Sequence, residues 1–297
     1  MINFRKIEIS DKKLYDQRKV GKSLCGCEMS FANLFLWGEQ KIADVKGCLV
    51  FKSTFGRTFY PFPIGDGDVK GAIQEIMLDA EQREIELEIT SIAEKDKQFI
   101  EENFPDRFEF FEKDGTFDYI YDIDDLANLA GKKYHKKRNH LAQFNKACPD
   151  YVVEPISKDN FAAVKEMVSR WYSERLAASP DSDFDYEMDF FESAISNFEE
   201  LNLTGITLKC GQKIIAVTFA SQMEEDVLDV HFEKAFNEIP GAYVAINNEF
   251  AKYVKENFPS IKYLDREEDM GLEGLRKAKE SYYPHHLMRK YRAKLKK

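Results

Sequence analysis

The stretch from Val227 to Tyr283 constrains the fold more than any other part of the sequence, because its hydrophobic period changes along it. Apolar and polar side chains alternate over 227–233, which predicts a strand with Asp229, His231 and Glu233 on one face. A turn signal and an apolar stripe at helical spacing follow, and then a second short strand and a final helix. The stretch therefore predicts an α/β arrangement.

Two features of this stretch suggest a functional site. A helix that begins directly after a strand, here near Gly241, presents free backbone N–H groups that suit an anion. The polar run Asp265–Asp269 follows the end of the next strand, where α/β sheets place their ligand crevices. The alternative is a solvated turn, since most loops are polar for no chemical reason. His231 and Glu233 can likewise be a hydrogen-bonded pair without a catalytic role.

Length and charge restrict the class of protein. The 297 residues fit two domains of ordinary size, and 43% hydrophobic residues suffice for packed cores. A net charge of −10 means that nucleic acid or anionic lipid must be met by a local basic patch. The sequence lacks an apolar run of about 20 residues and an apolar signal-peptide core. We therefore expect a cytoplasmic protein.

The cysteines give no sign of a disulfide framework or a zinc site. Their number is five, which is odd, and we expect them to be free thiols in a cytoplasmic protein. Cys25 and Cys27 are separated by one residue, and no second pair of ligands follows at zinc-site spacing. We predict no metal site from the sequence.

The sharpest local reversal of charge lies between Gly131 and Lys146. This segment has no acidic residue, whereas it carries six lysines or arginines and two histidines at or near a helical repeat. One interpretation is a phosphate-binding face for RNA, a lipid headgroup or a nucleotide. The other is a solvated basic helix that pairs with acidic neighbours.

The order of strands and helices in the first half is nearly repeated in the second half. We therefore expect two copies of one fold, made of mixed α/β sheets. The predicted organisation is an N-terminal domain over residues 1–122, a basic linker helix over 123–148, and a C-terminal domain over 149–297 that carries the site.

Three segments together carry a family resemblance: Lys133–Leu141, Asp229–Ala235 and Tyr263–Lys279. They resemble the C-terminal catalytic domain of phosphatidylglycerol lysyltransferase and its relatives, the tandem transferases that move amino acids from aminoacyl-tRNA onto cell-wall precursors. The resemblance implies two tandem Gcn5-related N-acyltransferase-like domains and aminoacyl transfer. Such an enzyme positions an activated ester, removes a proton from the acceptor and stabilises an oxyanion.

The resemblance also implies roles for individual residues. The implied catalytic residues, with His231 as candidate base, are His231, Asp265, Arg266 and Glu267. The implied substrate-binding residues, for phosphates, the acceptor or the tRNA end, are Lys136, Lys137, Arg138, Glu268, Arg276 and Lys279.

The sequence also departs from its apparent relatives. Full-length lipid lysyltransferases carry a transmembrane portion, for which this sequence offers no candidate, so the acceptor stays open between lipid, peptide and cell-wall precursor. Acyl-CoA enzymes of this fold have several glycines before the central helix, whereas Asn237–Ala242 contains one. We expect aminoacyl-tRNA as donor and no cofactor. The alternatives are an acyl-CoA-dependent N-acyltransferase and a non-catalytic binder of a phosphorylated ligand. Contact with a membrane surface remains open.

Overall fold

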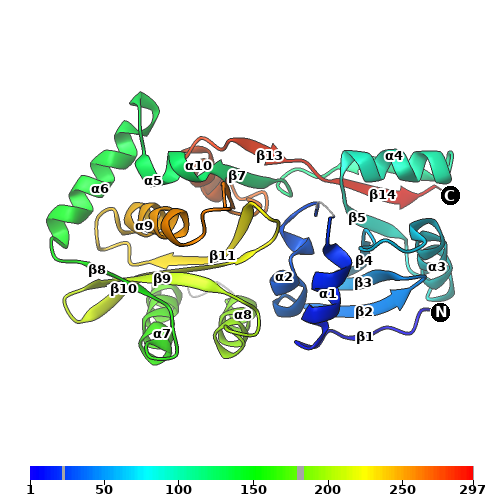
Figure 1. Ribbon diagram of the computed structural model, residues 1–297, viewed down its shortest axis with the longest axis horizontal. Coiled ribbons are helices and arrows are strands. Elements are labelled where there is room, and N and C mark those ends of the chain that lie inside the picture. Colours follow the sequence, from blue (N-terminus) through cyan, green and yellow to red (C-terminus); the bar gives the residue numbers. More distant parts are fainter. Residues whose placement is uncertain (22–23, 179–183, 297) are drawn as a thin grey trace. The chain divides into compact units, whose positions relative to one another are not determined.

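The computed structural model describes residues 1–21, 24–178 and 184–296 (Figure 1). The chain forms two compact units. The first unit comprises Met1–Asp118, Glu268–Glu273 and Leu287–Lys297. The second unit comprises Tyr119–Glu267 and Gly274–His286. Among the described residues, no helix is both long and apolar enough to cross a membrane.

The elements of the first sheet and its helices are β1 (Arg5–Lys6), α1 (Asp11–Lys19), η1 (Cys27–Met29), α2 (Phe31–Leu36), β2 (Glu39–Val45), β3 (Cys48–Phe55), β4 (Arg57–Pro61), α3 (Val69–Gln82), β5 (Glu88–Ile92), α4 (Glu94–Asn103), β6 (Phe108–Glu112) and β14 (Tyr291–Leu295).

The elements of the second sheet and its helices are β7 (Asp118–Asp122), α5 (Ile123–Asn128), η2 (Lys132–Tyr134), α6 (His135–Ala147), β8 (Val152–Pro155), α7 (Phe161–Ala178), α8 (Asp185–Ser196), β9 (Thr204–Cys210), β10 (Lys213–Gln222), β11 (Val227–Ala235), α9 (Ala242–Asn257), β12 (Tyr263–Asp265), α10 (Glu273–Glu280) and β13 (His286–Met288).

The two sheets repeat one topology. Their strand orders are β1-β2-β3-β4-β5-β14-β6 and β13-β7-β12-β11-β10-β9-β8. In the first sheet β4 and β5 run parallel, and in the second sheet β11 and β12 run parallel, at the corresponding position. A helix connects the two strands of each parallel pair, α3 in the first sheet and α9 in the second. The expected fold class of mixed α/β sheets, repeated in tandem, is confirmed.

The structure divides the chain differently from the predicted domains 1–122 and 149–297. Strand β14, near the C-terminus, pairs with β5 and β6 and completes the first sheet. Strand β7, from the first half of the chain, pairs with β12 in the second sheet. Consecutive strands are usually neighbours, so this exchange is not what the sequence order predicts. The predicted linker 123–148 forms α5 and α6, which pack against α9 within the second unit.

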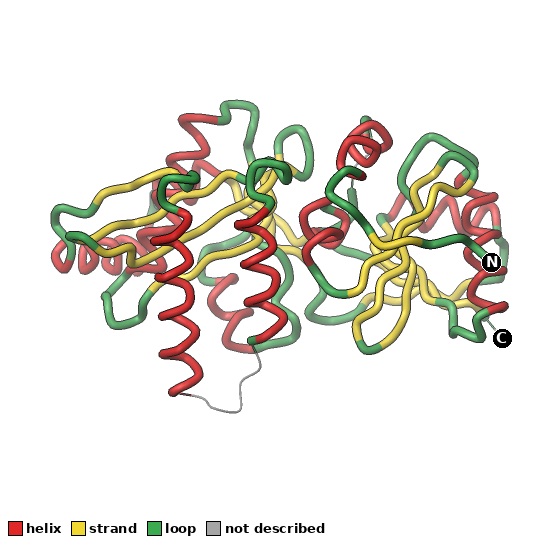
Figure 2. Tube along the Cα trace, turned by 90° about the horizontal axis from the view of Figure 1, so that it is seen from below, coloured by secondary structure: helices red, strands yellow, loops and turns green. Residues whose placement is uncertain are grey.

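The second sheet has different chemistry on its two faces. On one face α7 and α8 lie side by side (Figure 2), and α7 packs on β10 and β11. Phe232 of β11 stacks on Phe219 of β10 there, with ring centroids 5.2 Å apart and an interplanar angle of 9°. Helix α9 contacts β9, β10 and β11 from the other face (Figure 1). Glu233 of β11 is on this α9 side, where Asn247 of α9 contacts it.

Local signals explain how the basic segment enters the second unit. The Asp122 carboxylate accepts hydrogen bonds from the backbone N–H groups of Asp124 and Asp125, so it caps α5 as an N-cap residue does. Leu129, with φ of 49° and ψ of 39°, ends α5 in the left-handed region. The chain then turns into η2 and α6, and the acidic cap precedes the basic helix directly.

The expectation of free thiols is wrong for one pair of cysteines. Cys148 and Cys210 form a disulfide, with their Cα atoms 5.8 Å apart and a separation of 62 residues in sequence. Cys148 ends α6 and Cys210 ends β9, and the sequence alone does not show that these two ends meet. Cys25, Cys27 and Cys48 are buried thiols outside this disulfide, as expected.

Candidate active site

Strand β11 carries three ionisable side chains, Asp229, His231 and Glu233. Glu233 is on the face that α9 covers, because Asn247 of α9 donates to it across 3.4 Å. The pairing of β11 with β10 shifts by one residue at His231, since Phe219 is opposite Phe232 and Ala220 is opposite Val230, so the strict alternation predicted over 227–233 does not hold there. The Asp229 and His231 side chains are fully buried. Buried ionisable groups are costly, so each requires a compensating interaction.

The end of β12 supplies the partner of Glu233. Arg266 follows the last residue of that strand, and its Nη2 donates to Glu233 Oε1 across 2.8 Å. These side chains are only 14% and 13% exposed. The Arg266 guanidinium also lies 5.1 Å from the centroid of the Tyr282 ring and 5.7 Å from that of Tyr121. Ion pairing and cation–π contact together hold this buried cation.

Lys137 reaches the same cluster from α6. Its Nζ donates to Ser281 Oγ across 2.7 Å and lies 3.3 Å from the centroid of the Tyr282 ring. Burial and the charge of Arg266 lower the pKa of Lys137 to about 8, although Glu233 acts in the opposite direction. Lys137 of the basic segment and Arg266 after β12 therefore meet at the Tyr282 ring in the second unit.

Two atoms of this cluster lack an expected partner. Arg266 Nη1 and Asn247 Oδ1 are buried, and neither has a hydrogen-bond partner among the described residues. Buried polar groups are nearly always satisfied, so an unsatisfied donor and acceptor in one cluster need an explanation. Both residues also contact the Glu233 carboxylate. The cluster thus offers a donor and an acceptor to a ligand beside a carboxylate.

His231 of β11 belongs to a separate cluster, with Ser221, Asp229 and Glu267. Its Nε2 lies 2.7 Å from Ser221 Oγ. Its Nδ1 lies 3.4 Å from both Asp229 Oδ2 and Glu267 Oε1. Both ring nitrogens therefore face protein atoms, and nothing tests the prediction that His231 is the base.

Asp265 and Lys279 fix the turn after β12. The Asp265 carboxylate accepts from the backbone N–H of Glu267 across 2.7 Å. Lys279, which is 7% exposed, donates its ammonium to the backbone carbonyls of Arg266 and Glu267. The structure therefore places Lys279 as a positioning residue for the turn. A role for its ammonium as a phosphate ligand on an open surface does not fit this burial.

Other predicted site residues lie apart from the cluster. Arg138 donates to the backbone carbonyls of Leu129 and Gly131, so its guanidinium secures the chain before α6. Lys136 is exposed to solvent, and Arg276 is half-buried on α10. Glu268 belongs to the first unit. Burial lowers the pKa of Lys290 there, but the charges of Asp118 and Glu28, and to a smaller extent that of Glu268, raise it overall.

The structure adds residues that the predicted site lacked. Glu233 pairs with Arg266, and Asn247 donates to Glu233. The Tyr282 ring contacts both Lys137 and Arg266. Glu233 lies two residues from His231 in the strand that the sequence predicts over 227–233. An amide in the apolar stripe of a central helix is the signal for Asn247, because a buried amide needs partners.

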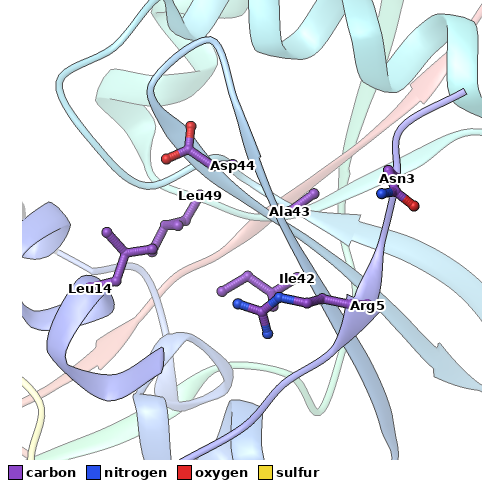
Figure 3. A pocket seen from close by; sticks show the side chains of 7 residues that line it. All are labelled: Asn3, Arg5, Leu14, Ile42, Ala43, Asp44 and Leu49. Atoms are coloured by element: carbon purple, nitrogen blue, oxygen red, sulfur yellow. The ribbon is translucent and has the colours of Figure 1, made fainter. Parts of the chain in front are cut away.

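A hollow of about 260 Å³ lies in the first unit, away from these predicted residues (Figure 3). Its lining is mostly apolar, and its charged members are already paired. Arg5 bonds to Asp11 across 2.7 Å, and Asp44 pairs with Arg18 across 2.8 Å. The residues that line it are Asn3, Arg5, Leu14, Ile42, Ala43, Asp44 and Leu49. We assign no function to this hollow.

Tandem mixed sheets, with a charged cluster at the parallel pair of the second sheet, define the class of Gcn5-related transferase folds. A family model described as phosphatidylglycerol lysyltransferase, C-terminal, matches residues 23–294, and the chain belongs to this family.

Solved structures agree with this family. A conserved protein of unknown function from Bacteroides thetaiotaomicron is 35% identical, with 100% of both chains covered and a TM-score of 0.91. L-PGS from Bacillus licheniformis is 17% identical over 99% of this chain and 94% of that chain, with a TM-score of 0.72. FemX is 11% identical over 98% and 97% of the two chains, with a TM-score of 0.57. At such identities the last two show a shared fold. A comparison with proteins of curated function finds no match.

Proposed function

We propose that the protein transfers an aminoacyl group from an aminoacyl-tRNA to a nucleophilic acceptor, a lipid hydroxyl or the hydroxyl or amine of a peptide or cell-wall precursor. One observation carries the proposal: Lys137, Glu233 and Arg266 meet in a cluster whose donor Nη1 is unsatisfied among the described residues. The family supports the same chemistry.

The cluster suits the two polar ends of an aminoacyl ester. The α-ammonium group needs an anion and acceptors, which Glu233 and Asn247 Oδ1 offer side by side. Attack on the ester carbonyl places negative charge on its oxygen. Arg266 Nη1 is a buried donor that can bind that oxyanion, in surroundings where such a bond stabilises the transition state strongly.

Lys137 is our candidate for the base. A lysine with its pKa lowered to about 8 is a neutral amine in part of the molecules near neutral pH. The neutral amine can take the proton from the attacking acceptor as the new bond forms. It can then return a proton to the leaving ribose hydroxyl, so that the site ends each cycle unchanged.

The packing around α9 favours an aminoacyl donor over acyl-CoA. Gly241, at the N-terminus of α9, has φ of 78°, and a Cβ there would lie 2.1 Å from the backbone oxygen of His140 in α6. The basic helix therefore packs against the helix end that would receive a coenzyme A pyrophosphate. Exposed lysines on and before α6, among them Lys132 and Lys136, are available to a tRNA backbone.

The test is a transfer assay with labelled aminoacyl-tRNA. The acceptors are vesicles that contain phosphatidylglycerol, short peptides, and peptidoglycan precursors. We expect label in one acceptor class, and we expect Arg266→Gln and Glu233→Gln to abolish most of it. Lys158→Gln is the control, because this exposed lysine pairs with Glu199 and lies outside both the cluster and the basic segment.

Absence of transfer to every acceptor, together with no tRNA binding at low salt, would overturn the proposal. Tight binding of tRNA or a phosphorylated ligand without turnover would favour the non-catalytic binder instead. A rise in melting temperature with millimolar acetyl-CoA would favour the acyl-CoA alternative, because a ligand that binds the native state stabilises it.

A further inference from the structure

The Asp229, His231 and Glu267 cluster has the composition of a metal site. Each residue offers one donor atom, and the three atoms lie within 4.8 Å of one another. Asp229 and His231 come from β11, and Glu267 comes from the turn after β12. One imidazole and two carboxylates form a donor set that zinc accepts, and the two carboxylates neutralise a divalent cation.

The distances in this cluster are long for charge-assisted hydrogen bonds and match the separation of ligands around one cation. His231 Nδ1 lies 3.4 Å from each of the two carboxylate oxygens, and its contact with Glu267 Oε1 is a long hydrogen bond. Charge-assisted bonds between nitrogen and carboxylate are shorter, about 2.7–2.9 Å. Zinc binds nitrogen and oxygen at about 2.0–2.1 Å, so neighbouring ligands in a tetrahedron lie about 3.3 Å apart.

Ser221 supplies the outer contact that metal-bound histidines have. Its Oγ lies 2.7 Å from His231 Nε2, and it can accept a hydrogen bond from the Nε2–H group. Nδ1 then keeps its lone pair, which faces both carboxylates. A lone pair directed at two anions is unfavourable unless a cation lies between them. Ligating histidines commonly donate their other N–H in this way, which fixes the tautomer and the orientation of the ring.

In a comparable cluster of the first unit, a lysine side chain occupies the place between the carboxylates. Cys27, Glu28 and Asp118 also bring their donor atoms within 4.8 Å of one another. There the Lys290 ammonium lies 2.6 Å from the Glu28 carboxylate and 2.9 Å from the Asp118 carboxylate. A buried lysine thus takes the place of a cation in that cluster. In the second unit the central basic group is an imidazole, which can itself ligate a metal.

We propose that Asp229 Oδ2, His231 Nδ1 and Glu267 Oε1 bind a divalent transition metal, with zinc as the best fit. Glu267 is the most exposed of the three, at 22%, so the remaining coordination position opens on its side. The metal would tie β11 to the turn that carries Arg266. This inference does not depend on the proposed aminoacyl transfer.

The experiment uses the full chain, stripped with a chelator and then titrated with Zn²⁺ against a competing chelator. We expect one zinc per chain and a higher melting temperature. Co²⁺ in the same site should give visible d–d absorption without a thiolate charge-transfer band. Glu267→Gln should weaken zinc binding at least tenfold, and Ser221→Ala should weaken it about 10–100-fold through the outer contact.

Two control variants separate this site from other zinc ligands. Cys27→Ser removes a thiol of the first-unit cluster, and His286→Ala removes one ring of the His285–His286 pair, whose Nδ1 atoms lie 2.9 Å apart. Both should bind zinc like the unaltered protein. Zinc binding that survives Glu267→Gln, or that is lost in either control, would overturn the proposal. So would the absence of any zinc uptake by the stripped protein.

Discussion

The two units use the same scaffold with different contents. In the first unit the α3 helix covers the parallel pair β4 and β5, and Tyr60 of β4 is fully buried in an apolar cluster with Ile73 and Ile76. Its phenol bonds to Asp79 of α3 across 2.9 Å. In the second unit the corresponding strand β11 carries Asp229, His231 and Glu233, and Glu233 contacts Asn247 of α9. This strand therefore packs in an apolar core in the first unit, whereas it carries ionisable side chains in the second unit.

The N-termini of the two central helices, α3 and α9, also differ in charge. Asp68 caps α3 and accepts from the backbone N–H of Gly71 across 2.8 Å. At α9 the N-cap is Gly241, and no side chain of the described residues caps it. The acidic cap neutralises the positive end of α3, whereas α9 keeps its end positive beside the basic helix α6. This difference is why we propose the second unit, and not the first, as the site of the chemistry.

The largest expected effect on stability lies in the first unit. Lys290→Gln leaves the buried Asp118 and the half-buried Glu28 without their ammonium partner, and Lys290 is only 2% exposed. We expect a loss of about 3–5 kcal/mol in the free energy of unfolding, because breaking a buried ion pair strands charge. Urea denaturation measures it. Activity per folded molecule should stay unchanged, and a selective loss of activity would contradict the division of roles.

The largest expected effect on rate lies in the second unit. Arg266→Gln removes the proposed oxyanion donor, and we expect kcat for aminoacyl transfer to fall about 100–1000-fold. The matched control is Arg83→Gln, because Arg83 of α3 pairs with Asp79 across 2.8 Å in the first unit. That variant should lose stability and keep its kcat. Equal losses of kcat in both variants would mean that the Arg266 effect is structural.

The sequence predicted those parts of the site that depend on local period. Alternation over 227–233 predicted the strand, but it did not predict the one-residue shift in the pairing with β10 at His231, so a common face for His231 and Glu233 does not follow from it. Composition also singled out the basic segment, but it could not separate Lys137 from Arg138. These neighbours on α6 point differently, one into the cluster and the other onto backbone carbonyls. That difference depends on where α6 packs, which no local pattern records.

For the fold as well, the sequence predicts the local elements but not the long-range pairing of strands. The strands and helices of each repeat follow from hydrophobic period and turn residues. The exchange of β7 and β14 does not, because pairing partners lie far apart in the chain. The Cys148–Cys210 disulfide was missed for the same reason.

The pH dependence of transfer tests the role of Lys137. If its neutral amine is the base, the rate should fall about tenfold per pH unit below a pKa of about 8 and level off above it. The folded pKa lies below the ordinary value of 10.5, so the unfolded chain binds more protons between these two values. The contribution of Lys137 to the unfolding free energy should therefore rise with pH in that window.

Steady-state rates from pH 6 to 9, corrected for spontaneous ester hydrolysis, give the profile. Lys137→Gln should remove the rise near pH 8 and lower the plateau about 100-fold or more. The control is Lys133→Gln, because Lys133 pairs with Asp125 at the surface and lies outside the cluster. A profile that keeps its rise in Lys137→Gln would assign the base to another group.

The smallest expected effect comes from Tyr60 of β4, the strand of the first unit that corresponds to β11 in the second unit. Tyr60→Phe deletes the hydroxyl that donates to Asp79 and leaves the ring in its apolar cluster. Asp79 keeps its bonds to Arg83 and to the backbone N–H of Ile2. We therefore expect a loss of only about 1 kcal/mol in unfolding free energy, with kcat unchanged. A loss of transfer activity at full stability would show that the first unit takes part in the chemistry and would end the distinction between the two repeats.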